Sequence, residues 1–287
     1  MTGRPRPRQS DARVGHSPLV LSSVPLCSPD MIDGFERTEG GQPVYRHGPR
    51  QTDFELAAGD EKNIQAISDH IEATIGPIVN VWHEIISDLV HLDLHIVEPT
   101  KEKPYYVVVT SGMSDRPMNV PSGLDDPEKD LRFAELAIGL PPGWKLDDES
   151  LSDERWYWPL RLLKQLARLP HEYGTWLGIG HSISNGDPAQ PYDSSTRMDG
   201  VIVMSPFFPG TPGQASDGFA TLERDGKPRV HFYGLLPVYP EEMDYKMSHT
   251  DGAWGLFDLL DTDQVIPLNP ERTSAVPTSP RWKFWKR

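Results

Sequence analysis

The first clear hydrophobic pattern along the chain has the period of a helix. Within residues 53–75, apolar side chains recur at helical spacing, and they are Ile64, Ile67, Ile71 and Ile75. Gly76–Pro77 then interrupts the pattern, and we expect a second short helix from there to Ile86. The first of these two segments therefore predicts an amphipathic helix with an isoleucine stripe.

From Leu89 the apolar period changes to two, which predicts a strand over residues 89–98. Its apolar side chains share one face (Leu92, Leu94 and Ile96), and its polar side chains share the other (His91, Asp93 and His95). We interpret the polar set as the exposed side of this strand, since many strands have one solvated face.

The rest of the chain alternates short strands with a few helices. Strands are predicted at 104–113, 131–144, 175–183, 200–205 and 230–238, an amphipathic helix at 155–169, and two short helices near 240–247 and 251–261. Strands outnumber helices, and several are consecutive. The predicted fold class is therefore α+β, with a mixed, largely antiparallel β-sheet flanked by helices.

The charge distribution changes what this fold is expected to bind. The 287 residues carry a formal net charge of −14, with 28 basic and 42 acidic side chains. Eight basic and two acidic residues lie in 1–30 and 281–287, which leaves a net charge of −20 over 31–280. Such a body repels phosphate backbones, so we expect no nucleic-acid partner. It would attract a basic protein.

The termini differ from the middle of the chain. We predict a disordered basic leader over 1–35, a globular domain over 36–272 and a flexible tail over 273–287, ending in "RWKFWKR". Met31 is a hypothetical true start. The tail would suit a lipid surface or an acidic groove, although a frayed end is the simpler interpretation. No apolar run reaches the roughly 18–20 residues of a membrane span.

Cysteine usage and motifs narrow the chemistry further. Cys27 is the only cysteine, which excludes an internal disulfide and a cysteine-based zinc cluster and suits a reducing compartment, so we predict a cytoplasmic location. The phosphate-binding motifs G-x-G-x-x-G and G-x-x-x-x-G-K-[ST] are absent, and so is the nucleophile elbow G-x-S-x-G. We expect no cofactor and no catalytic constellation.

The stretch "VWHEIISDLVHLDLHIV" (81–97) is rich in metal-binding side chains. It begins like the zincin motif H-E-x-x-H, but Ser87 replaces the second histidine. His91 and His95 are about 13 Å apart along a strand, and a pair such as His91 with Asp93 needs a third ligand from elsewhere. We therefore interpret the stretch as structural, with no metal.

The alternative interpretation of this stretch is an enzyme. It is a metal-dependent hydrolase built on His83, Glu84, His91 and Asp93.

Several segments, in this order, resemble the Suppressor of fused (SUFU-like) domain family. They are "WHEIISDLVHLDLH", "EPTKEKPYYVVVTSGMSDRPMNVP", "FAELAIGLPPGW", "WPLRLLKQLARLPHEYGTWLGIGHSI", "GVIVMSP" and "HFYGLLPVYPEEMDY". The resemblance covers about residues 45–272, so the predicted domain is a SUFU-like domain of the bacterial single-domain form. Its most specific element is a six-residue motif, Thr110, Ser111, Gly112, Met113, Ser114 and Asp115.

The resemblance implies a non-enzymatic binding protein. The eukaryotic relative is a Hedgehog-pathway regulator that clamps a peptide of a transcription factor, partly by strand addition, and bacterial members look like immunity proteins of polymorphic toxin systems. The expected partner is thus a protein, such as a basic toxin domain. An intracellular regulatory scaffold is an open alternative. Acidic side chains after Met113 are candidate contacts, namely Asp115, Asp125, Asp126 and Glu128.

Overall fold

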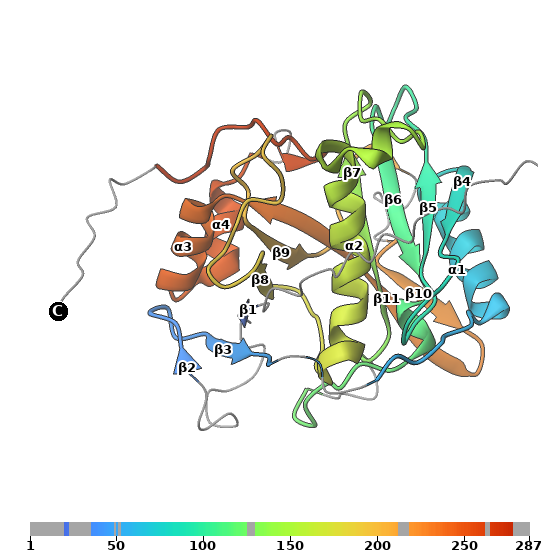
Figure 1. Ribbon diagram of the computed structural model, residues 1–287, viewed down its shortest axis with the longest axis horizontal. Coiled ribbons are helices and arrows are strands. Elements are labelled where there is room, and N and C mark those ends of the chain that lie inside the picture. Colours follow the sequence, from blue (N-terminus) through green and yellow to red (C-terminus); the bar gives the residue numbers. More distant parts are fainter. Residues whose placement is uncertain are drawn as a thin grey trace, which may run out of the picture.

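A long mixed sheet runs through the protein (Figure 1). The computed structural model describes residues 20–22, 36–48, 50, 53–124, 130–211, 218–261 and 265–277. Within these ranges the strands are β1 (Val20–Ser22), β2 (Glu36–Arg37), β3 (Pro43–Arg46), β4 (Ile78–His83), β5 (Asp93–Val97), β6 (Tyr106–Ser111), β7 (Ala134–Leu140), β8 (Ser182–Ser184), β9 (Gly200–Met204), β10 (Thr221–Arg224) and β11 (Lys227–Val238).

The strand order explains how the sheet is assembled. It is β2-β3-β1-β8-β9-β11-β7-β6-β5-β4, with β10 paired to the first part of β11. β7 and β11 are parallel, with His231 opposite Ala134, whereas every other strand pair in the described residues is antiparallel. β11 therefore joins an antiparallel meander, β4 to β7, to the strands of the other half.

Helices cover both faces of this sheet. They are α1 (Glu61–Thr74), α2 (Glu154–Tyr173), α3 (Pro240–Ser248) and α4 (Gly252–Leu259), with short 3-10 turns η2 (Met113–Asp115) and η3 (Ser150–Ser152). In Figure 1, α2 crosses the middle of the sheet, while α1 and the α3–α4 pair lie at opposite ends. The predicted α+β fold class is confirmed.

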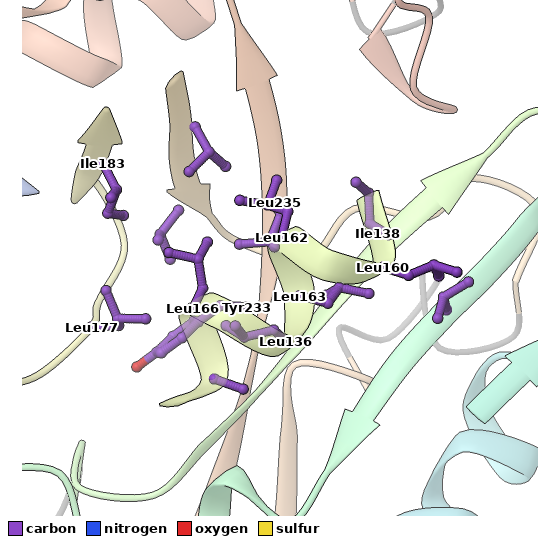
Figure 2. Close-up of a cluster of buried hydrophobic side chains, with 14 of the residues drawn as sticks. Leu136, Ile138, Leu160, Leu162, Leu163, Leu166, Leu177, Ile183, Tyr233 and Leu235 are labelled. Carbon is purple, nitrogen blue, oxygen red and sulfur yellow. The ribbon is translucent and has the colours of Figure 1, made fainter. Parts of the chain in front are cut away.

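α2 supplies the larger core. The Asp153 side chain accepts a hydrogen bond from the Arg155 N–H at the start of the helix, and Gly174, in the left-handed conformation, ends it. Its leucines point at the sheet, as Figure 2 shows for Leu162, Leu163 and Leu166. They pack on inward side chains of β7, β9 and β11, which are Leu136, Ile138, Leu140, Val201, Val203, Tyr233 and Leu235.

The opposite face has two smaller clusters. The predicted isoleucine stripe of α1 is confirmed, because Ile67, Ile71 and Ile75 pack on the β5–β7 region. At the other end, Leu256 of α4 packs against Leu236 of β11. Ile266 contacts both clusters, so this face is covered along much of its length.

Two sequence predictions near the start of the sheet are wrong. Residues 78–83 form strand β4 instead of the short helix expected through Ile86, because their backbone pairs with β5 and β-branched side chains suit a strand. The polar side of β5 is also buried instead of exposed. Asp93 and His95 lie on the same face of β5 as Val97, and Val97 packs with α1, so the helix lies over the face that was expected to meet water.

Other expectations concern short segments or residues outside the described ranges. The sequence pattern did not indicate β2, β3 or β10, which have only two to four residues each. From the predicted leader the structure describes residues 20–22 alone, which pair with β3 and β8. Cys27, Met31 and the "RWKFWKR" ending lie outside the described residues.

Candidate functional site

The turn after β6 is held by a buried glutamate on β7. Glu135 Oε2 accepts a 2.6 Å hydrogen bond from the Thr110 hydroxyl. Its Oε1 accepts from the Gly112 N–H at 3.0 Å, and from the Ser114 N–H and hydroxyl at 3.0 and 2.7 Å. Burial raises the pKa of Glu135 to about 7, although these donors oppose the effect. Three residues of the six-residue motif, Thr110, Gly112 and Ser114, therefore all donate hydrogen bonds to this one carboxyl group.

Gly112 is required at this turn by both conformation and space. Its φ of +102° is a backbone conformation that residues with a Cβ rarely adopt. A Cβ built there would lie 1.8 Å from the carbonyl oxygen of His91. The glycine thus allows the β6 turn to approach the segment that leads into β5.

The end of the motif holds the start of α1. The Asn63 side chain donates to Ser114 Oγ at 3.0 Å and to Asp115 Oδ1 at 2.8 Å, while the Asp60 N–H donates to Asp115 Oδ2 at 3.0 Å. Burial raises the pKa of the Asp115 carboxyl. Asp115, a candidate partner contact, is thus directed at α1, whereas Asp125, Asp126 and Glu128 lie outside the described residues.

Three side chains with metal-binding atoms meet where β4 ends and β5 begins. His83 lies opposite Asp93 in the antiparallel pair, and His91 comes two residues before Asp93. Asp93 Oδ1 is 3.0 Å from His83 Nδ1 and 3.3 Å from His91 Nε2. The Asp93 side chain is 1% exposed, and the His83 side chain is 66% exposed. The cluster therefore has a buried floor and an open side.

Glu84 is directed away from this cluster. It forms ion pairs with Arg168 and Lys164 of α2, the latter at 3.7 Å. It also accepts a 3.0 Å hydrogen bond from the Ser87 hydroxyl, whose oxygen is 2.9 Å from His91 Nδ1. Glu84 thus contacts the cluster only through Ser87 and His91.

His95 belongs to a separate contact on the same strand. Its Nε2 lies 2.8 Å from the Ser111 hydroxyl oxygen. Burial lowers the pKa of His95 to about 4, so the ring is neutral at pH 7. Ser111 of the motif therefore orients a histidine that, against expectation, lies on a buried face.

Of the four residues in the hydrolase hypothesis, the structure brings together His83, His91 and Asp93. His83 reaches the other two because it lies on β4, which pairs with β5 and places His83 opposite Asp93. Glu135 and Arg168 were missed as supporting residues. Glu135 left a signal, since it is the one charged residue in the apolar run "AELAIGL", whereas Arg168 is one of several cations on α2.

Comparison with known proteins identifies the family. The profile of the family described as Suppressor of fused protein (SUFU) matches residues 88–273, which is more than half of the chain. This chain belongs to the SUFU family. Among curated proteins, none matches it in sequence. In the described residues, none of the helices combines the length and the apolar character that crossing a membrane requires.

Three solved structures are similar to this chain. A SUFU homologue from Neisseria gonorrhoeae has a TM-score of 0.51 and 16% identity over 77% of this chain and 100% of its own. A chain of the Sufu-Fu complex has a TM-score of 0.45 and 12% identity, over 77% and 93% of the respective chains. Drosophila Suppressor of Fused has a TM-score of 0.44 and 14% identity, over 76% of this chain and 54% of its own. The first of these supports the same fold.

Proposed function

We propose that this chain is a non-enzymatic protein that binds a protein partner along the β4 edge of its sheet, and that it acts as an immunity protein for a basic toxin domain. The observation that carries the proposal of a binding surface is a group of exposed apolar side chains at this edge. We call it the apolar edge, and it consists of Phe54, Leu56, Val79, Ile85 and Ile86.

The apolar edge has the properties of a docking surface. β4 pairs with β5 on one side and, among the residues that the structure describes, is the last strand of the sheet. The segment with Phe54 and Leu56 runs beside residues 87–89, since Leu56 bridges Asp88. Ile85 is 98% exposed, and proteins rarely leave large aliphatic side chains beside a free strand edge without a use for them. A partner strand could pair there and cover these side chains.

The acidic net charge supports the proposed immunity function. The net charge of −20 over residues 31–280 would attract a cationic protein and accelerate its association. Nucleases that act as toxins bind a polyanion and are themselves basic, so an acidic inhibitor fits them. A regulatory scaffold shares the apolar edge and the charge, and the identity of the partner distinguishes the two functions.

The test is a capture experiment with matched variants. The full chain, Ile85→Ser/Ile86→Ser and a control, Trp254→Ser/Leu259→Ser, are used to capture proteins from the native cell, followed by mass spectrometry. The control removes exposed apolar side chains from α4, which packs on β9 and β11 and lies at the opposite end of the sheet from β4 (Figure 1). We expect a stoichiometric partner with the wild type and the control, and loss of most of it with the Ile85/Ile86 variant.

Each outcome has a defined meaning. Equal capture by all three proteins would contradict the apolar edge as the binding surface. No partner with any of them would contradict the binding function. A basic partner that is toxic when expressed alone, and harmless when expressed with this chain, would support the immunity function, whereas a harmless partner would favour the scaffold.

A further inference from the structure

We propose that His83, His91 and Asp93 form a binding site for one divalent transition-metal ion, with zinc as the best-fitting class. The site is separate from the protein-binding function proposed above and does not depend on it. His91 and Asp93 are two residues apart in the sequence, and the antiparallel pairing of β4 with β5 places His83 opposite Asp93.

The donor atoms have the spacing that such an ion requires. All three lie within 4.8 Å of one another, and two of the separations are 3.0 and 3.3 Å. Ligands about 2.0–2.1 Å from a tetrahedral zinc ion are about 3.3 Å from each other. Small movements of the exposed His83 ring would be enough to adjust the remaining distance. Two imidazoles and one carboxylate are a ligand set that zinc accepts.

Asp93 provides an independent argument. Its side chain is 1% exposed, and its Oδ1 has no hydrogen-bond partner in the part of the chain that the structure describes. The two histidine nitrogens are close to this oxygen but are not aligned to donate to it. A buried carboxylate oxygen without a partner costs free energy. A cation between the three groups would remove that cost.

The contacts behind His91 orient it as a ligand. The Ser87 hydroxyl donates to Glu84, so the Ser87 oxygen accepts from the His91 Nδ1–H at 2.9 Å. That arrangement leaves the lone pair of His91 Nε2 directed at Asp93 and the ion. Metal-binding histidines usually donate their second N–H to such a partner. Glu84 is in turn held by Arg168, so these contacts continue into α2.

The open side of the site determines how an ion would be held. His83 is the exposed ligand, so the ion enters from solvent and keeps at least one position for water or another small ligand. Three protein ligands with a free position are typical of accessible zinc sites, in contrast to closed four-ligand structural sites.

The test is zinc titration of the metal-free protein by calorimetry. The full chain is purified with a tag that lacks histidine, treated with a chelator and dialysed. We expect one zinc ion per chain for the wild type. His83→Ala should weaken binding at least tenfold without unfolding the protein, because His83 is exposed and lies at the end of its strand. The matched control is His249→Ala, which removes another exposed histidine, after α3.

Asp93→Asn provides a second variant, with circular dichroism to show that it is folded. It should also weaken zinc binding, and Ser87→Ala should do so to a smaller extent. The proposal is overturned if the wild type binds no stoichiometric zinc, or if His83→Ala and Asp93→Asn bind zinc as tightly as the wild type and His249→Ala. Nickel or cobalt bound more tightly than zinc would retain the site and change only the assigned metal.

Discussion

At the scale of single residues, Gly112 is the clearest case of a position with one acceptable side chain. We expect Gly112→Ala to destabilise the protein strongly, because it combines a left-handed backbone with a collision between the new Cβ and the His91 carbonyl oxygen. The loss in the free energy of unfolding should exceed the roughly 1–2 kcal/mol of the backbone conformation alone. Urea denaturation measures it.

Gly174→Ala is the matched control for that measurement. Gly174 has a φ of +59°, and a Cβ there meets no atom within 4 Å. The Gly174→Ala variant should therefore lose only the free energy that the left-handed backbone costs, about 1 kcal/mol. If both variants lost the same free energy, the close approach to His91 would have no energetic role.

Glu135 leads to a pH prediction. Its pKa is about 7 in the folded protein and near 4.5 in the unfolded chain, so the folded state binds more protons between these values. The contribution of this group to stability is complete below pH 4.5, and it falls as the pH rises to about 7. The loss is roughly 3 kcal/mol.

Glu135→Gln tests this prediction by urea denaturation at pH 5 and pH 8. Glutamine can keep the hydrogen bonds on one oxygen and donate to Thr110 instead of accepting from it. The variant should therefore lose less stability than the wild type between the two pH values. Glu72→Gln on the exposed side of α1 is the control and should match the wild type. Equal pH dependence in all three proteins would show that Glu135 is ionised throughout.

At the scale of elements, α2 fixes the segment between β4 and β5. Arg168 pairs with Glu84 and lies near the carbonyl oxygen of Asp88 at 3.4 Å. We expect Arg168→Ala to accelerate amide hydrogen exchange in residues 84–91, with a loss of only about 1 kcal/mol in global stability. Arg161→Ala, which removes the pair with Glu154 on the same helix, should leave exchange in 84–91 unchanged.

Elements with a strong intrinsic pattern were predictable from the sequence. The isoleucine stripe of α1, the leucines of α2 and the apolar runs of β6, β7 and β11 all appear where their periods indicated. β4 was expected to be a helix although its β-branched side chains favour a strand, because its short apolar run shows no clear period and its pairing with β5 cannot be seen in its own segment. The same non-local pairing brings His83 to Asp93, so spacing along the chain could not show which of the four residues in the hydrolase hypothesis would meet.

At the scale of the whole molecule, a buried ion pair fastens the end of the domain to α3. Arg272 and Glu242 have side chains that are 2% and 0% exposed, and they form two hydrogen bonds of 2.5 and 2.6 Å. Arg272→Ala leaves a buried carboxylate without its cation, and we expect a loss of about 3–5 kcal/mol, measured by urea denaturation. Adding Glu242→Gln should recover part of it. If Arg272→Ala left the free energy of unfolding unchanged, the pair would not stabilise the fold.

The parallel pairing of β7 with β11 has a consequence for biosynthesis. The β4–β7 meander is complete once Leu140 has been translated, but β7 receives its second neighbour about 90 residues later, when His231 and the residues after it emerge. At typical rates of translation this interval is on the order of 5–20 s. During that time the nascent chain has a free strand edge at β7 as well as at β4, and a chaperone that covers hydrophobic strands on the ribosome would protect it from aggregation.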